Sequence, residues 1–157
     1  MYRGRFYRII GLLIAIDVLS GAFAQAPAGS IAVTSIAEVE RSNKLVPADR
    51  IVSGDMVIYT LEVRNTAPAT APPPIVIFPV PEHMIYLADS AVGPGTEVSY
   101  SVDGGHSFDS PENLHIKEAG EPARPAAAAD YTHIRWQLKN ALKSNSVAFV
   151  RFRALAK

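Results

Sequence analysis

Apolar and polar residues alternate with a period of two in three stretches of the chain. The apolar positions on one face are Val57, Tyr59, Leu61 and Val63 in the first stretch, Ile134, Trp136 and Leu138 in the second, and Val150, Phe152 and Ala154 in the third. Successive side chains of a β-strand point to opposite faces, so this pattern predicts antiparallel strands with one buried face. Tyr59, Leu61, Trp136 and Phe152 are therefore expected in the core.

Turn-forming residues separate these stretches at short intervals, and no segment beyond residue 30 shows a sustained 3.6-residue period. Short strands with frequent turns predict an all-β, Ig-like antiparallel β-sandwich of about seven strands. The expected strands lie near residues 31–40, 56–65, 75–79, 84–88, 96–103, 106–109 or 114–117, 132–138 and 146–156. We expect a loop at residues 126–129, because four alanines are too few to nucleate a helix.

Prolines flank the apolar stretch Ile75-Val76-Ile77-Phe78 on both sides. Proline has no N–H to donate to a β-ladder, and it is found on edge strands and at strand ends. The sequence therefore predicts an edge strand that is protected from pairing with further strands.

The N-terminus has the three-part pattern of a secretory signal peptide. Arg3, Arg5 and Arg8 precede an apolar run over residues 9–16, and Ala22-Phe23-Ala24 supplies small residues for cleavage. The alternative is an uncleaved anchor, but a spanning helix needs about 20 apolar residues, whereas this run is shorter and is followed by Asp17. The prediction is a signal peptide over residues 1–24, a flexible linker over 25–30 and one domain over 31–157. The protein is then exported, to the periplasm, the cell surface or the medium.

The composition of the chain argues against some classes of function. The chain has 15 basic and 15 acidic residues; without the three arginines and one aspartate of the leader, 12 basic and 14 acidic residues remain, a net charge of −2. This balance gives no sign of nucleic-acid binding. The absence of cysteine excludes disulfides and a lipidated cysteine anchor.

Residues 105–109, Gly-His-Ser-Phe-Asp, are similar to the nucleophile elbow of α/β-hydrolases. That elbow needs a strand-to-helix turn and a final glycine, and neither is present around Ser107. A type I′ turn at Asp103-Gly104, between Val102 and Phe108, accounts better for these residues. The sequence therefore predicts no enzyme and no catalytic residue.

The loop region also contains oxygen ligands for calcium. Asp103 and Asp109 are six residues apart, with Ser101, Ser107 and Asn113 as further donors. Calcium takes six to eight oxygens, and neither an EF-hand nor a nonapeptide repeat is present. A solvated turn is favoured over a metal site, and no cofactor is expected.

Histidines and aromatic residues offer two further binding patterns. His83, His106, His115 and His133 have neither metal-ligand spacing nor a cysteine to complete a zinc site. Four aromatic residues close to turns would suit stacking on a sugar if they were exposed, although aromatic rings usually lie in the core. These residues are Tyr86, Tyr100, Phe108 and Tyr131.

Four motifs resemble those of the bacterial conserved-repeat domain, the domain-of-unknown-function family numbered eleven. They lie at residues 52–66, 80–91, 100–108 and 130–136, and residues 148–157 resemble the closing strand of the family. The resemblance covers residues 31–157 and is closest to short, single-copy exported members. It implies an Ig-like sandwich with no established activity. Phe78 stands where many members have Asp or Asn, and Lys143-Ser144-Asn145 replaces the usual glycine before the last strand.

Together these patterns predict an exported, non-enzymatic structural or adhesive module of the bacterial envelope or surface. Its partner is an envelope or surface protein that the sequence does not identify. The alternative is a ligand-binding module that holds calcium or a glycan in the loops around residues 103–113 and Tyr131.

Overall fold

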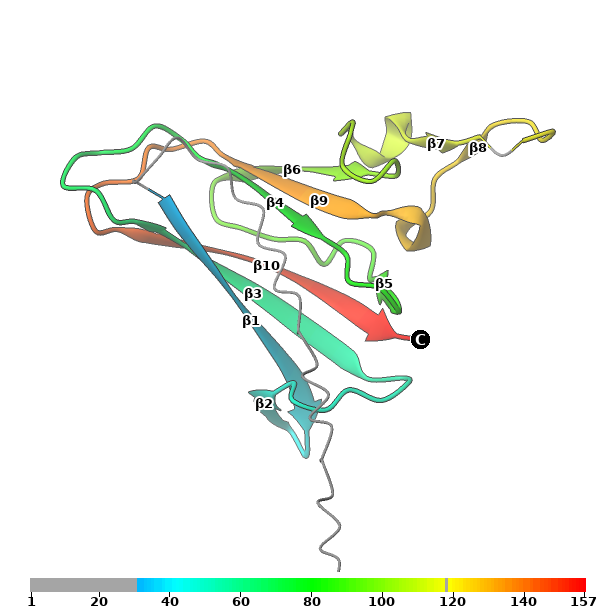
Figure 1. The fold of residues 1–157 in the computed structure, drawn as a ribbon, viewed down its shortest axis with the longest axis horizontal. Helices are drawn as coiled ribbons and strands as arrows, with labels where there is room; N and C mark the ends of the chain where they lie inside the picture. Colours follow the sequence, from blue (N-terminus) through cyan, green and yellow to red (C-terminus); the bar gives the residue numbers. More distant parts are fainter. Residues whose placement is uncertain (1–30, 118) are drawn as a thin grey trace, which may run out of the picture.

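The computed structural model describes residues 31–117 and 119–157, which form two facing β-sheets (Figure 1). The predicted signal peptide and the linker at 25–30 lie outside the described residues. In chain order the strands are β1 (Ile31–Arg41), β2 (Lys44–Pro47), β3 (Met56–Asn65), β4 (Ile75–Pro79), β5 (Met84–Tyr86), β6 (Thr96–Ser101), β7 (His115–Ile116), β8 (Arg124–Pro125), β9 (His133–Leu138) and β10 (Val147–Ala156).

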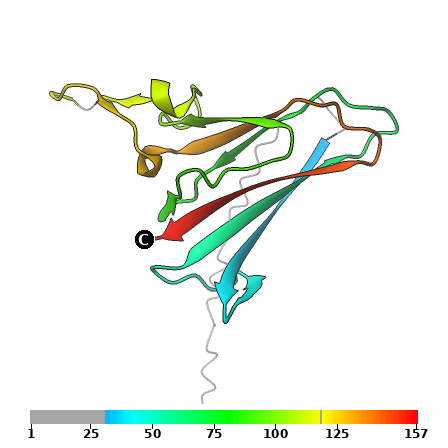
Figure 2. The same ribbon diagram turned by 180° about the vertical axis from the view of Figure 1, so that it is seen from behind.

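The first sheet has five strands in the order β2-β1-β3-β10-β5, and the second has three in the order β4-β9-β6. All pairings are antiparallel. The same two layers appear from behind in Figure 2, with β7 and β8 forming a separate ribbon beyond the end of β6. The predicted all-β sandwich is confirmed. Short strands β2 and β8 were not predicted.

The period-two alternation sorts side chains between the core and the two outer faces. Tyr59, Leu61, Trp136 and Phe152, the expected core residues, are all at most 8% exposed. The ring of Phe152 lies at the centre of this core, stacked on Tyr59 with a centroid distance of 4.8 Å and 6.1 Å from the ring of Trp136. Burial of these large apolar side chains provides the main favourable term for folding.

Strand β4 is an edge strand, as its flanking prolines predicted. It pairs only with β9, so its other side is open within the described residues. Val76 is buried between the sheets, whereas Ile75 and Ile77 point outward and are exposed.

Asp55 connects the start of β3 to the end of β1. Its carboxylate accepts hydrogen bonds from both terminal nitrogens of the Arg41 guanidinium and from the Val52 N–H. The bond from Arg41, followed by the bond from Val52, lowers the pKa of Asp55 to about 2.

Two local predictions are wrong. Asp103 does not have positive φ, so Asp103-Gly104 is not a type I′ turn; Gly104 and Gly105 adopt positive φ instead. The chain closes further away, where Tyr100 and Asp109 form an isolated bridge with backbone N···O distances of 2.9 and 3.0 Å. Residues 126–129 were expected in a loop; 126–127 lie outside any element, but 128–130 form one turn of 3-10 helix.

The helices within the described residues are two such single turns, at 111–113 and 128–130. Neither has the length or the apolar character needed to span a membrane.

Candidate functional site

The outer face of the five-stranded sheet exposes several large apolar side chains. Among the described residues, ten large apolar side chains are exposed, and six of these lie on this face or along its β10 edge. The six are between 36% and 54% exposed, and they are Ile36, Leu45, Met56, Val92, Phe149 and Leu155. We call this set, with the half-buried Ile58 and the polar residues between them, the outer face. Charged side chains separate some of them, since Arg151 and Arg153 lie between Phe149 and Leu155 on β10. Exposed apolar side chains that share one face are candidates for contact with a partner.

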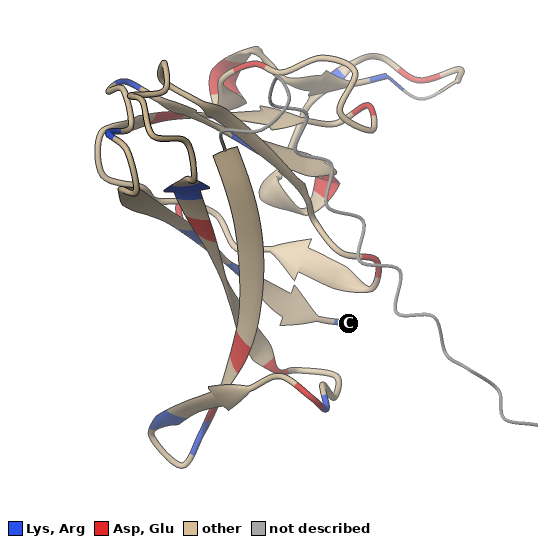
Figure 3. Cartoon of the chain, turned by 60° about the vertical axis from the view of Figure 1, so that its left-hand side comes forward, with Lys and Arg blue, Asp and Glu red and all other residues tan. Residues whose placement is uncertain are grey.

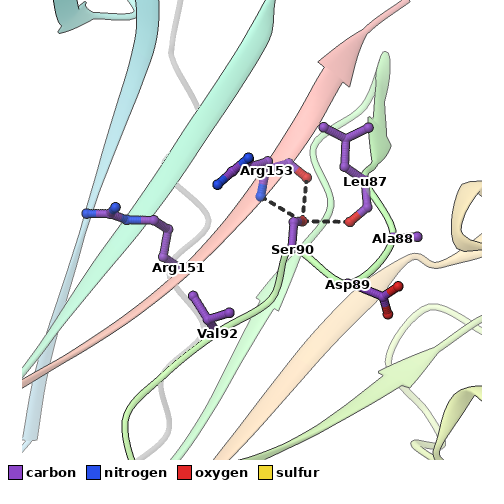
Figure 4. A pocket seen from close by; sticks show the side chains of 7 residues that line it. All are labelled: Leu87, Ala88, Asp89, Ser90, Val92, Arg151 and Arg153. Carbon is purple, nitrogen blue, oxygen red and sulfur yellow. Dashed lines mark hydrogen bonds between the residues drawn. The ribbon is translucent and has the colours of Figure 1, made fainter.

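A groove crosses the outer face between β10 and the connection from β5 to β6 (Figure 4). It consists of two adjoining hollows of about 530 and 380 Å³ that share Val92 and Arg151. Backbone hydrogen bonds hold residues 87–92 along β10. Val92 and Arg151 exchange two N–H···O bonds of 2.8 Å, and the Leu87 N–H donates to the Arg153 carbonyl over 3.0 Å.

Ser90 fixes the middle of this connection. Its hydroxyl donates to the Leu87 carbonyl at 2.6 Å and accepts the Arg153 N–H at 3.0 Å (Figure 4). Since the wall of the groove is hydrogen-bonded to the neighbouring strand, its shape is preorganised for binding.

The charges of the outer face are separated across the sheet. β10 contributes Arg151 and Arg153, while β1 contributes Glu38 and Glu40 near its C-terminal end, where Figure 3 shows the strand in red. Three of these charged groups, on Arg153, Glu38 and Glu40, make no hydrogen bond or ion pair with any described residue. The guanidinium of Arg151 donates only to the Thr60 hydroxyl, at 3.1 Å. Glu62 and Arg64, by contrast, pair with each other on β3.

The two aspartates considered for calcium each organise their own part of the loop. Asp103 accepts hydrogen bonds from the hydroxyls of Ser101 and Ser107, at 2.7 and 2.6 Å, and from the backbone N–H groups of His106 and Ser107. These bonds, led by the one from the Ser107 hydroxyl, hold the pKa of Asp103 well below its usual range.

Asp109 has a different set of donors. It accepts from the Ser110 N–H at 2.7 Å and from the Asn113 side-chain amide at 2.9 Å, and the bond from Asn113 is the main cause of its lowered pKa. Across residues 31–117 and 119–157, no three His, Cys, Asp or Glu side chains gather in a group that could hold a metal ion.

The histidines and Ser107 make local contacts. Ser107 donates to Asp103, so its hydroxyl is bound to a carboxylate and not to an imidazole. The Nδ1 of His115 lies 3.0 Å from the Asn113 carbonyl, and the Nδ1 of His133 lies 3.2 Å from the Thr132 hydroxyl. Burial lowers the pKa of His133.

Three of the four aromatic residues considered for sugar stacking are buried, which corrects the idea of an exposed aromatic platform. Tyr86, Tyr100 and Tyr131 are at most 8% exposed, and the rings of Tyr100 and Tyr131 stack on each other at 4.5 Å. The fourth residue, Phe108, is partly buried with the guanidinium of Arg135 4.9 Å from its ring centroid.

These tyrosines line a small pocket of about 170 Å³ together with Asp89 and three apolar residues. The hydroxyls of Tyr86 and Tyr100 lie 3.0 Å apart, and the Ala91 N–H donates to Tyr86. The hydroxyl of Tyr131 has no partner among the described residues. Desolvation, with the charge of Asp89 contributing, raises the pKa values of Tyr100 and Tyr131.

Sequence reasoning did not find the outer face. One signal was available in β10. Phe149 and Leu155 are apolar, yet they occupy the same outward-facing positions as Arg151 and Arg153, alternating with the buried residues of the strand. Comparisons of the chain with protein-family models, with curated proteins and with solved structures found no match.

Proposed function

We propose that the protein is an exported, non-enzymatic structural or adhesive module of the bacterial envelope or surface, and that it works by packing its outer face against a protein partner. The observation that carries this proposal is the number of exposed apolar side chains that share the outer face, from Phe149 to Leu155 along β10 and across to Ile36, with the two arginines of β10 among them.

The composition of the outer face suits a protein interface. Full burial of a Leu, Ile, Phe or Met side chain contributes about 1.5–3 kcal/mol. Ile36, Met56, Phe149 and Leu155 are already about half buried, so burying their remaining surface would contribute about 3–6 kcal/mol in total. This amount offsets part of the entropy cost of association, which is about 4–15 kcal/mol. Phenylalanine, methionine and arginine, which the outer face exposes at Phe149, Met56, Arg151 and Arg153, are enriched at protein interfaces.

Export and family membership are supported by the sequence. The basic, apolar and small-residue segments at the N-terminus favour a cleaved leader. Four motifs in order favour a single copy of the conserved-repeat domain.

Fractionation of cells that express the full chain tests the export step. We expect a soluble species that begins at Gln25 in the periplasm or the medium, identified by intact mass. A membrane-bound species that retains Met1 would contradict the proposed export and make the leader an anchor.

Native extracts of the same cells test the docking step. Phe149→Asp should move the protein from a larger assembly to the elution volume of a single chain in gel filtration. Ile77→Asp is the matched control, because Ile77 is an exposed apolar residue on the other sheet. Equal elution of wild type and Phe149→Asp would refute docking through the outer face.

A second function, ligand binding, is favoured by the pocket beside Tyr131. Its unpartnered hydroxyl and the Asp89 carboxylate would accept hydrogen bonds from sugar hydroxyls. NMR titration with a panel of monosaccharides should shift resonances of the pocket in wild type but not in Tyr131→Phe. Titration with Ca²⁺ tests the loop aspartates in parallel. Absence of saturable shifts with either ligand would remove this function.

A further inference from the structure

We infer that the partner of the outer face is a second copy of this chain, docked about a two-fold axis that runs parallel to β3. This inference rests on the proposed function, because it names the occupant of the same surface. It follows from the placement of the unpaired charges in the sheet register.

Strand pairing places Glu38, Ile58 and Arg153 in a single row across β1, β3 and β10. Glu38 is opposite Ile58, and Ile58 is opposite Arg153. Neighbouring strands lie about 4.8 Å apart, so the two charged residues are separated by about two strand spacings. Each charge is unpaired among the described residues, although opposite charges lie in the same row.

A two-fold interface uses the same patch on both subunits, so that residue i contacts j and j contacts i. Rotation by 180° about an axis along β3 places β1 of one copy over β10 of the other and keeps each row in register. Glu38 of each copy then faces Arg153 of its partner copy, and Ile58 meets its own counterpart. One rotation thus forms two equivalent ion pairs around an apolar centre.

The rows on one side of Glu38 are compatible with this arrangement, whereas on the other side the register places Glu40 near Leu155 of the second copy. In the next row, Ile36 is opposite Thr60, which is opposite Arg151, so Ile36 would pack on the aliphatic stem of Arg151 from the second copy. One row further, Glu62 would meet its own counterpart, but the adjacent Arg64 already balances its charge.

Charge also selects this axis over the alternative. A two-fold axis in the plane of the sheet but perpendicular to β3 would place β1 on β1 and β10 on β10. An axis of this kind that crosses the strands near Glu38 and Arg153 would bring glutamates close to glutamates and arginines close to arginines, and such like-charge contacts are unfavourable. Both axes align the strands of the two facing sheets, which is a preferred packing of sheets face to face, so the choice between them rests on charge.

Sedimentation velocity on the purified exported protein tests the inference. We expect a two-chain species in wild type. Arg153→Glu should raise the dissociation constant by at least about tenfold, since the symmetry converts two attractions into two repulsions. Glu38→Arg should do the same. The matched control is Glu97→Arg, because Glu97 is exposed on the outer side of the three-stranded sheet.

Charge exchange makes the test specific to this geometry. Mixing Arg153→Glu chains with Glu38→Arg chains should restore the dimer, because each mixed pair regains two opposite-charge contacts. Circular dichroism spectra of all variants check that each one is folded. A wild type that stays a single chain at every concentration, or a mixture that fails to restore the dimer, would overturn the inference.

The failure of this inference and the failure of the proposed function give different results. The purified protein could be a single chain while Phe149→Asp still dissociates a larger assembly in extracts. In that case the inferred dimer is wrong, and docking of another partner through the outer face stands. If Phe149→Asp leaves that assembly intact, the proposed function itself is contradicted.

Discussion

Replacement of Asn65 by alanine should destabilise the sandwich strongly, although the side chain is polar. Asn65 ends β3 and is fully buried. Its Nδ2 donates to the carbonyls of Ala69 and Leu142 at 2.8 and 2.9 Å, and its Oδ1 accepts the Ala67 N–H at 3.0 Å. One amide thus joins the loop after β3 to the loop before β10.

The magnitude follows from these three bonds. A hydrogen bond contributes about 0.5–1.5 kcal/mol net to the free energy of unfolding, and a buried polar group left without its partner costs about 1–3 kcal/mol. Leu142 keeps a second bond to its carbonyl from the Ala71 N–H, which limits the loss. We expect Asn65→Ala to lower the free energy of unfolding by about 3 kcal/mol.

Urea unfolding followed by the fluorescence of Trp136, the single and fully buried tryptophan, measures this loss. With a slope of about 1–3 kcal/mol per molar, the midpoint should fall by about 1–3 M. Glu97→Ala, at an exposed position, should stay within about 0.5 kcal/mol of wild type. A midpoint for Asn65→Ala equal to that of Glu97→Ala would refute the role given to the amide.

Three further predictions concern the core, a tight turn and pH. Phe152→Ala should cost about 3–5 kcal/mol in urea unfolding, because it removes the ring stacked on Tyr59 at the centre of the core. Gly93→Ala should cost about 1–3 kcal/mol in the same assay, since the added Cβ would lie 2.8 Å from a methyl carbon of Val150. The pKa of Asp55 is lowered to about 2 from its usual 3.8, so its stabilising contribution is complete above 3.8 and is lost as pH falls through about 2. Thermal unfolding from pH 5 to pH 2 should therefore show a shallower loss of stability in Asp55→Asn than in wild type; parallel curves would contradict this assignment.

Strands with strong local alternation were predictable from the sequence. The bounds expected for β3 and β4 agree with the structure, because their alternating or proline-bounded apolar residues define where each strand begins and ends. β2 follows a two-residue turn in which Ser42 and Asn43 both have positive φ. That turn is compatible with Ser-Asn, but the four-residue strand after it has no alternation to reveal it.

The loop at residues 101–108 shows a different limit. Its glycines indicated positive φ correctly, but the conformation depends on Asp103, whose carboxylate gathers hydroxyl and N–H donors from both sides. A turn motif concerns residues that are adjacent in sequence. It does not indicate which side chain will accept hydrogen bonds from the hydroxyl and backbone N–H groups of the loop.

The sequence indicated the outward positions of β10, but the outer face as a whole could not be predicted because it depends on long-range register. Glu38, Ile58 and Arg153 lie in one row only because β1 and β10 pair with opposite sides of β3. Alternation within one strand separates buried from outward positions, but it does not tell which outward positions of other strands lie alongside.

Site-specific photocrosslinking in expressing cells tests the central claim most directly. A benzophenone amino acid is placed at Phe149, on the outer face, or at Ile75, a similarly exposed apolar position on the opposite sheet. The outer-face position should give a light-dependent adduct with a single protein, and the control position should give none. No adduct at Phe149, or equal adducts at both positions, would contradict docking through the outer face.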